Sequence, residues 1–394
     1  MKRSIVVIGA GPAGLAAGIA AAQCGHHVTV LERNNTAGKK LLLSGQGQCN
    51  VTHSGSVSDF LTHYGSAQQG RFVRPALYHF DNEAVMRFFA DAGVPLWIRR
   101  DGKVFPKSMQ AKDILNALLR KLGQSGGQLV TNTCVQCAEK GNDGFRIETN
   151  SGTVTADSLI IAAGGQSYPA TGSDGNGYRL AESFGHRIVT VKPALTAVSV
   201  RDYAFSESAG TAFADIPFQI VHNGKVSAKR CGSVLLTHTG LSGPGILDAS
   251  RLIESGDIIR LQLIPPEKLS PDLYSGKRTL KNVLQTLGLP ETFLLQLFRL
   301  LDIPVTQAAA ETNRLQRQRL ESALTRCTFS VQQCGTWHEA MATAGGVDLT
   351  EVERQTLESR LVRGLYFCGE VLDIDGSTGG YNIQFALSSG FLIR

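Results

Sequence analysis

Three glycines near the amino terminus, Gly9, Gly11 and Gly14, have a spacing that suits a bound diphosphate. Gly9 permits a tight turn, Gly11 lets the backbone approach a pyrophosphate, and Gly14 lets a helix lie close to a strand. Pro12 and Ala13 stand where that helix begins, and a helix N-terminus attracts anions through its unpaired N–H groups. We therefore assign all five residues to a predicted nucleotide-binding site.

The elements around these glycines fit the same interpretation. A β-branched run at 5–8 precedes them, an alanine-rich segment continues to Gln23, and a second apolar run at 28–31 ends in Glu32. A carboxylate about 20 residues after the glycines can accept hydrogen bonds from ribose hydroxyls. Glu32 and its neighbour Arg33 therefore join the predicted nucleotide site.

Two other interpretations of this segment remain open from its composition. Lys2 and Arg3 precede an apolar stretch, as in a signal peptide, and residues 4–22 carry no charge, as in a membrane span. Neither explains the spaced glycines or the second strand that ends in an acid. We expect a cytoplasmic protein with no membrane contact.

The composition of the chain suits a globular protein of two or three domains. Its 394 residues are 42% hydrophobic, and the formal net charge is +6. A modestly basic surface suits an anionic cofactor, and nucleic acid is possible but not demanded. Cys134 and Cys137 lie three apart in an expected strand, so their sulfurs would point to opposite faces. We expect structural cysteines and no metal site.

The order of apolar patterns predicts one discontinuous nucleotide domain with an insertion. Helices are expected at about 82–92 and 110–123, and strands at 128–137, 144–149 and 153–162. Alternating apolar segments after Pro193 predict an antiparallel β region, and helices follow, one of which has Pro290 at its N1 position. The predicted domains are the nucleotide-binding domain at 1–192 and 337–394, a β-rich domain at 193–270 and a helical subdomain at 271–336.

Five ordered blocks identify a family resemblance that covers essentially the whole chain. Besides the glycine motif, they lie at 38–52, 162–175, 237–244 and 369–382. Together they resemble the YhiN-type family of FAD-dependent oxidoreductases, which is similar to aminoacetone oxidases and bile-acid enone reductases. The resemblance implies an α/β fold with a Rossmann-like, glutathione-reductase-like FAD-binding domain. One departure is visible, because Gln48 stands where the family usually has an arginine.

The resemblance also implies where FAD binds. The turn Gly379-Gly380-Tyr381-Asn382 opens the last helix, whose N–H groups would face the N1–C2=O end of the flavin and favour its reduced anion. Gly369 and Glu370 would hold the ribityl chain or the pyrophosphate, and the backbone of Val135 would pass the adenine. The remaining residues expected to bind the cofactor are Lys40, Ser44, Gly45, Ala163, Gly164 and Gly165.

A flavin passes hydride through N5, so the protein has to position the substrate and supply a proton carrier. Candidates must come from loops close to the ring, and His53 and Tyr381 are the first choices. The other polar candidates in glycine-rich loops are Cys49, Asn50, Tyr168 and His238.

The expected function is hydride transfer between a small organic substrate and FAD. No second glycine motif follows a strand, so NAD(P)H would dock transiently as a co-substrate, or molecular oxygen would reoxidise the flavin. A protein that modifies or binds nucleic acid is the alternative, favoured by a pI of about 8.9 and the arginine-rich segment 314–326. The scattered basic residues and the lack of an aromatic platform disfavour it. The sequence leaves the oligomeric state open.

Overall fold

The computed structural model describes residues 2–394 and divides the chain into two compact units. The first unit comprises Met1–Pro193 and Ala340–Arg394, and the second comprises Ala194–Glu339. Each unit has its own hydrophobic core.

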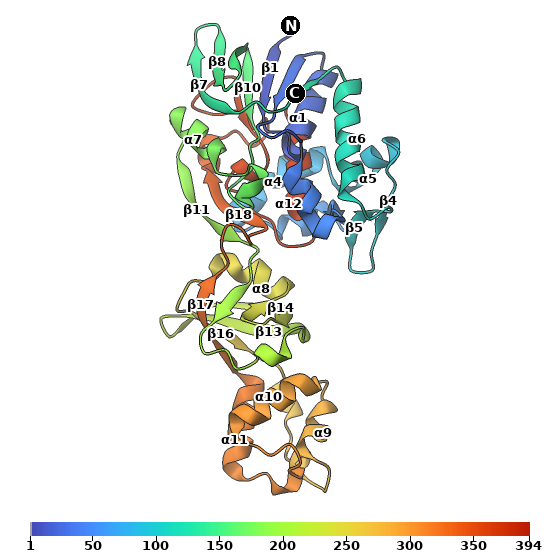
Figure 1. The fold of residues 1–394 in the computed structure, drawn as a ribbon, viewed down its shortest axis with the longest axis vertical. Helices are drawn as coiled ribbons and strands as arrows, with labels where there is room; N and C mark the ends of the chain where they lie inside the picture. Colours follow the sequence, from blue (N-terminus) through green and yellow to red (C-terminus); the bar gives the residue numbers. More distant parts are fainter. Residues whose placement is uncertain (1) are drawn as a thin grey trace. The chain divides into compact units, whose positions relative to one another are not determined.

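A parallel sheet lies at the centre of the first unit, with the strand order β19-β10-β1-β2-β6 (Figure 1). The strands are β1 (Ser4–Ile8), β2 (His27–Leu31), β6 (Gln128–Val130), β10 (Ser158–Ile161) and β19 (Leu365–Phe367). The sequences of β1, β2 and β10 are rich in valine, isoleucine and leucine, which suits strands buried on both faces. The predicted α/β, Rossmann-like fold is confirmed.

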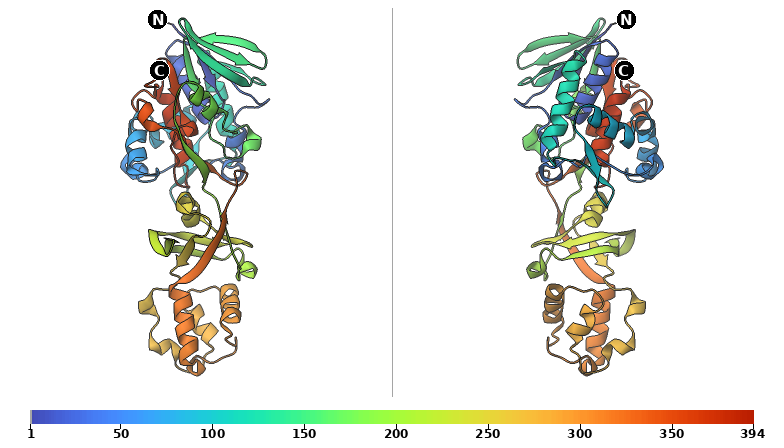
Figure 2. Two further views of the ribbon diagram at one scale, coloured as in Figure 1. Left: turned by 90° about the vertical axis from the view of Figure 1, so that its left-hand side faces the viewer. Right: turned by 90° about the vertical axis from the view of Figure 1, so that its right-hand side faces the viewer.

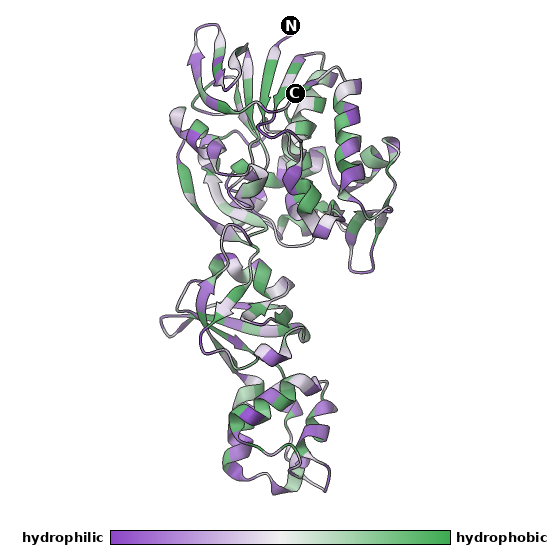
Figure 3. Cartoon of the chain, viewed as in Figure 1, coloured by the Kyte–Doolittle hydropathy of each residue, from purple (hydrophilic) through white to green (hydrophobic). Residues whose placement is uncertain are grey.

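Eight α-helices lie in the described part of the first unit. They are α1 (Pro12–Gln23), α2 (Lys39–Leu43), α3 (Val57–Leu61), α4 (Ala67–His79), α5 (Asn82–Asp91), α6 (Ala111–Gln124), α7 (Asn176–Ser183) and α12 (Tyr381–Leu392). Helix α6 carries both hydrophobic and hydrophilic residues along its length (Figure 3) and buries Ile114, Leu115 and Leu118. Helix α1 buries ten consecutive residues, 13–22, because its small side chains let elements pack closely around it.

Small residues set the contact between α1 and α12. A Cβ placed on Gly390 of α12 would lie 2.4 Å from the carbonyl oxygen of Ala13. The helix that follows the glycine loop therefore packs directly against the last helix of the chain. Helices that start 369 residues apart in the sequence, at Pro12 and Tyr381, thus pack side by side in the first unit.

Three smaller sheets complete the first unit. Strands β7 (Val135–Gly141), β8 (Gly144–Thr149) and β9 (Gly152–Ala156) are antiparallel and form the teal and green sheet of Figure 2. Strands β4 (Leu96–Ile98) and β3 (Thr52–His53) flank β5 (Lys103–Pro106), and β11 (Ile188–Ala194) pairs with β18 (Ala342–Val347).

Two strand predictions were wrong in the same way. The segment 128–137 forms two strands, β6 and β7, that belong to different sheets, because Asn132 adopts a left-handed φ of 55° between them. The segment 153–162 likewise divides into β9 and β10. No glycine or proline separates the two strands of either segment, so the residue pattern did not mark the change of sheet.

The second unit contains a closed barrel of six strands. Their order is β12 (Val198–Val200), β15 (Gly240–Ser242), β14 (Lys225–Leu236), β13 (Ala212–His222), β16 (Ile258–Leu261) and β17 (Cys327–Cys334). All of its recorded pairings are antiparallel. Full closure leaves no exposed strand edge.

The helices of the second unit share its core. They are α8 (Pro244–Ala249), α9 (Leu280–Gln285), α10 (Glu291–Leu301) and α11 (Arg314–Thr325). Phe293 of α10 stacks on Phe205 with ring centroids 5.0 Å apart, and Phe205 also contacts Phe329 of β17. The predicted N1 position of Pro290 was wrong by one residue, because Pro290 is the N-cap. The separation of β-rich and helical domains at residue 270 stays a prediction.

No helix among residues 2–394 has the length and apolar character required to cross a membrane.

Candidate FAD and active site

The glycine loop between β1 and α1 has the form of a phosphate cradle. Gly9 has a φ of 103°, and a Cβ placed on Gly14 would lie 1.9 Å from the carbonyl oxygen of Gly9. These two glycines are therefore required by the loop itself. A Cβ on Gly11, in contrast, would meet no atom within 4 Å. Protein packing leaves room above Gly11, where the predicted pyrophosphate would approach.

The start of α1 completes this cradle. Gly11 is the N-cap, Pro12 occupies the first turn, and that turn contains no acidic side chain. The first-turn N–H groups of a helix, here including those of Ala13 and Gly14, lack intrahelical acceptors and carry a partial positive charge. This end of α1 fits a phosphate anion.

Glu32 lies beside the loop, as predicted. Its carboxylate is buried, with the residue 7% exposed, and accepts hydrogen bonds from the Ala10 N–H at 3.0 Å and the Asn34 N–H at 2.9 Å. A carboxylate can accept about four hydrogen bonds, so acceptor capacity remains for a ribose hydroxyl. Arg33 forms an ion pair of 2.6 Å with Asp174. The structure thus joins the end of β2 to the predicted 162–175 block.

The predicted adenine contact lies at the first residue of β7. Val135 is buried, and its carbonyl oxygen accepts a hydrogen bond from Asn176 Nδ2 at 3.1 Å. Ala163, Gly164 and Gly165 follow β10, at the same carboxyl edge of the sheet as the glycine loop that follows β1. This edge is where nucleotides bind in open parallel sheets.

Glu370 and Lys40 form the centre of a polar cluster from four separate segments. Lys40 Nζ lies 2.6 Å from Glu370 Oε2 and also contacts the hydroxyl of Ser167. The other carboxylate oxygen of Glu370 accepts hydrogen bonds from Ser167 Oγ at 3.1 Å and the Thr343 N–H at 2.8 Å. Gly369 precedes this carboxylate with a φ of 74°, and its N–H donates to Ser389 Oγ. The cluster ties both halves of the first unit together.

The loop after α2 is built by internal hydrogen bonds. Ser44 Oγ donates to the Leu41 carbonyl oxygen at 2.6 Å, and Gly45 adopts a left-handed φ of 56°. Burial raises the pKa of the fully buried Cys49 thiol to about 12, against a lowering by the Ser44 hydrogen bond. Cys49 is therefore held as a neutral thiol. Asn50 Oδ1 accepts the Val104 N–H at 3.2 Å, which fixes this loop to β5.

The predicted flavin turn has the conformation that two glycines allow. Gly379 and Gly380 have φ values of 123° and 100°, and a Cβ on Gly380 would lie 2.6 Å from the Thr52 carbonyl oxygen. Asn382 closes the turn, because its side-chain amide exchanges two hydrogen bonds with the backbone of Gly376, at 2.8 and 2.9 Å. Helix α12 begins at Tyr381, so its N-terminal N–H groups lie at this turn.

Tyr381 is the centre of an aromatic cluster. Tyr381 is 4% exposed. Its ring stacks with the ring of His53, at a centroid distance of 5.4 Å, and with that of His63, at 4.0 Å. Phe60 and Tyr64 meet it edge-on. The structure therefore brings together the two predicted catalytic residues, and it adds His63.

Sequence reasoning missed His63. It lies in segment 62–66 between α3 and α4, outside the five sequence blocks that carry the family resemblance. Only its ring contact with Tyr381 in the folded protein identifies His63 as a candidate site residue. The half-buried Tyr168 lies elsewhere in the first unit as the N-cap of a short 3₁₀ helix, and His238 is exposed in the second unit.

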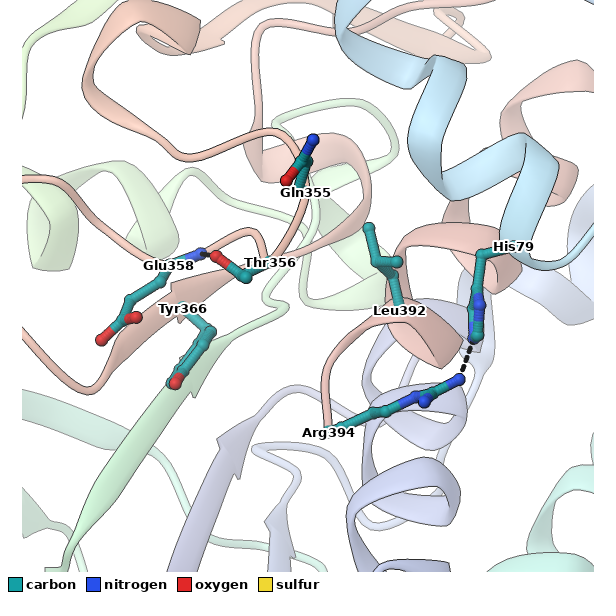
Figure 4. A pocket seen from close by; sticks show the side chains of 7 residues that line it. All are labelled: His79, Gln355, Thr356, Glu358, Tyr366, Leu392 and Arg394. Atoms are coloured by element: carbon teal, nitrogen blue, oxygen red, sulfur yellow. Dashed lines mark hydrogen bonds between the residues drawn. The ribbon is translucent and has the colours of Figure 1, made fainter.

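A small cavity of about 380 Å³ lies elsewhere in the first unit (Figure 4). It is lined by His79, Gln355, Thr356, Glu358, Tyr366, Leu392 and Arg394. None of the predicted cofactor-binding or catalytic residues lines it. In the described part of the chain, no group of three or more metal-ligating side chains comes together.

Comparison with known proteins provides independent evidence. The HI0933-like protein Rossmann domain matches residues 3–393. A 3-dehydro-bile acid delta(4,6)-reductase of Clostridium scindens is 31% identical over 98% of this chain and 97% of that protein. A ribosomal RNA dihydrouridine synthase of Escherichia coli is also 31% identical, over 98% of this chain and 96% of that protein.

A solved structure shares the fold over nearly the whole chain. The 3-ketosteroid delta1-dehydrogenase of Sterolibacterium denitrificans superposes with a TM-score of 0.53 at 14% identity, covering 99% of this chain and 98% of that one. This similarity supports the observed architecture.

Proposed function

Because the chain belongs to the HI0933-like family of FAD-binding flavoenzymes, we propose that it reduces a carbon–carbon double bond conjugated to a carbonyl group. The two relatives above motivate this substrate class. A 4,6-diene next to a 3-oxo group and the 5,6 double bond of a uracil ring are both conjugated to a carbonyl. One chemistry, hydride addition at the β-carbon and proton addition at the α-carbon, covers both.

The open space above Gly11 is the observation that carries the cofactor part of the proposal. A glycine that packing does not require, at a helix N-terminus and beside a buried carboxylate, suits a diphosphate and a ribose. The residues that would hold FAD are Gly9, Gly11, Pro12, Ala13, Gly14, Glu32, Arg33, Lys40, Ser44, Gly45, Val135, Ala163, Gly164, Gly165, Gly369, Glu370, Gly379, Gly380, Tyr381 and Asn382. Bound FAD supplies the hydride.

The first unit contributes charge and shape to this chemistry. The N-terminus of α12 carries the partial positive charge of a helix of 12 residues, which stabilises developing negative charge nearby. Lys40 adds a positive charge, and the carboxylate of Glu370 beside it offsets that charge. The stacked rings of Tyr381 and its two histidines provide an apolar wall with polar edges.

NAD(P)H is the proposed source of electrons, as a transient co-substrate. No second dinucleotide glycine motif exists in the sequence, so a permanent nicotinamide domain is not expected. A nicotinamide that docks, transfers its hydride and leaves would free the same position for the alkene. Reoxidation by molecular oxygen is the competing route.

An anaerobic titration tests this function. The purified holoenzyme is mixed with NADH or NADPH, and flavin bleaching is followed by absorbance. 4-Androstene-3,17-dione or 2-cyclohexen-1-one is then added. Bleaching by a nicotinamide followed by recovery of colour with an enone supports the proposal. Fast recovery with oxygen and none with either enone contradicts it and favours an oxidase.

Uridine in ribosomal RNA is the second candidate substrate. The names of the Escherichia coli relative and of a Haemophilus influenzae relative, 29% identical over 98% of this chain, favour it. The basic α11 gives it limited support. Arg317 lies 4.6 Å from the Tyr274 ring centroid and donates to the Thr312 carbonyl oxygen, so this arginine is already engaged.

A binding and product assay separates the two substrates. The holoenzyme is incubated with ribosomal RNA that lacks dihydrouridine, and the nucleosides are analysed by mass spectrometry. Dihydrouridine formation, with binding that weakens steeply as salt rises, would establish the RNA substrate. Absence of binding at low salt would remove it.

A further inference from the structure

His63 and His53 both stack on Tyr381, yet their ring nitrogens have different surroundings. His53 Nδ1 lies 2.7 Å from the Ser54 carbonyl oxygen and Nε2 lies 3.0 Å from the Asp101 carbonyl oxygen. Carbonyl oxygens only accept hydrogen bonds, so both contacts form together only when both nitrogens donate. Each ring nitrogen of His53 thus faces a backbone carbonyl oxygen.

The ring nitrogens of His63 make no hydrogen bond with any of residues 2–394. The residue is half-buried, and its ring lies 4.0 Å from that of Tyr381 with an interplanar angle of 12°. Both nitrogens therefore remain available to a substrate or to water. Of the two histidines, His63 is the one able to exchange a proton without breaking a protein contact.

The backbone holds His63 firmly against the predicted flavin turn. The Ser377 N–H donates to the His63 carbonyl oxygen at 2.9 Å, and Tyr64 pairs with Gly376 in an isolated bridge. Tyr64 Oη also donates to the Tyr381 carbonyl oxygen at 2.9 Å. These contacts of His63 and Tyr64 fix segment 63–64 to the loop before α12 and to the first residue of α12. A ring positioned in this way can act repeatedly at one place.

We infer that His63 is the proton donor of the site and that His53 is a positioning residue. This inference rests on the proposed alkene reduction. As the β-carbon receives the hydride, the π electrons of the double bond move to the α-carbon, and His63 in its imidazolium form gives that carbon a proton. The imidazole then regains a proton from water. NAD(P)H is the overall reductant, and the product has gained two hydrogens.

The charged groups around His63 set its pH response. Burial lowers its pKa below the ordinary 6.5, nearby His53 lowers it further, and Asp59 on the preceding helix opposes them. The Tyr381 ring is stacked on His63. Burial, followed by the interaction with Tyr381, raises the pKa of Tyr64, so Tyr64 stays neutral. The imidazolium population therefore falls as pH rises through a value below 6.5. The rate of alkene reduction should fall over the same range.

Stopped-flow experiments on the photoreduced, anaerobic holoenzyme test this role. Flavin reoxidation by 4-androstene-3,17-dione or 2-cyclohexen-1-one is measured across pH for the wild type, His63→Ala, His53→Asn and the control His79→Ala. His79 is an exposed histidine whose pKa is also lowered, first by partial loss of hydration and then by Arg394, but it lines the separate cavity. His63→Ala should slow reoxidation on the order of 100-fold and abolish its acid-dependent limb.

Two further readouts separate chemistry from structure. Free imidazole should restore part of the rate to His63→Ala, which a merely structural defect would not allow. His53→Asn should raise the substrate KM but retain the pH limb. An unchanged rate and pH limb in His63→Ala, or the absence of imidazole rescue, overturns the inference.

A measurement without substrate distinguishes failure of the His63 inference from failure of the proposed alkene-reductase function. Diethyl pyrocarbonate modification of the holoenzyme, followed by peptide mass spectrometry, reports which histidine nitrogens are free. His63 should react faster than His53, with a rate that rises as pH passes its lowered pKa. Preferential reaction of His53 overturns the inference. If no enone is reduced by the wild type but His63 reacts as expected, the alkene-reductase function fails and the availability of His63 stands.

Discussion

At the scale of single residues, the glycine loop contains two kinds of glycine. Gly14 is required by packing, whereas Gly11 faces open space. Gly14→Ala should destabilise folding by about 1–3 kcal/mol, because its Cβ would overlap the Gly9 carbonyl oxygen. Gly11→Ala should fold normally but lose about 1.4 kcal/mol or more of FAD affinity, which is about tenfold in Kd. Thermal melts of the apoproteins and FAD titrations check both predictions. Equal effects of the two substitutions would contradict the separate roles of Gly14 in packing and Gly11 in phosphate binding.

Asp373 provides a second prediction at the residue scale. Burial, followed by the charge of Asp375, raises the pKa of Asp373 to about 6, above its usual 3.8. A carboxyl group with a raised pKa in the folded state contributes stability below the unfolded pKa and loses it as pH rises through about 6. Asp373→Asn should therefore increase stability at pH 8 by on the order of 1 kcal/mol, after allowance for solvent screening, and change it little at pH 4. Urea unfolding at the two pH values measures this, and a loss of stability at pH 8 would refute it.

At the scale of elements, the packing of α12 on α1 links the flavin turn to the phosphate loop. Gly390→Ala would place a Cβ 2.4 Å from the Ala13 carbonyl oxygen, so it should lower stability by about 1–3 kcal/mol and weaken FAD binding. Gly123→Ala in α6 is the matched control, since its Cβ would meet nothing within 4 Å. That change should stabilise the protein by about 0.5 kcal/mol. Calorimetry of the two variants distinguishes helix packing from a general effect of alanine.

The same elements show what sequence patterns can and cannot predict. The β1–α1–β2 unit was predictable because its glycines, apolar runs and Glu32 are close in sequence. The change of sheet at Asn132 was not, because no glycine or proline marks the position where a left-handed φ separates the two strands. His63 was missed because its significance comes from a ring stacked on it 318 positions later in the chain, at Tyr381.

At the scale of the whole molecule, two separate hydrophobic cores predict two cooperative transitions. The first core contains the parallel sheet and α1, and the second contains the barrel and the helices of residues 194–339. All of the proposed FAD-binding residues belong to the first unit. FAD should therefore raise the temperature of one calorimetric transition by mass action and leave the other unchanged. A single transition, or an equal shift of both, would contradict the assignment of FAD binding to the first of two separately unfolding units.

Calorimetric titration of the apoprotein tests most directly whether the loop after β1 and the turn before α12 hold one dinucleotide. FAD should bind with a stoichiometry of one per chain, and FMN, which lacks the diphosphate bridge and the adenosine, should bind on the order of 100-fold more weakly, or about 2.7 kcal/mol. Equal affinity for FMN and FAD, or no heat with either, would contradict the account.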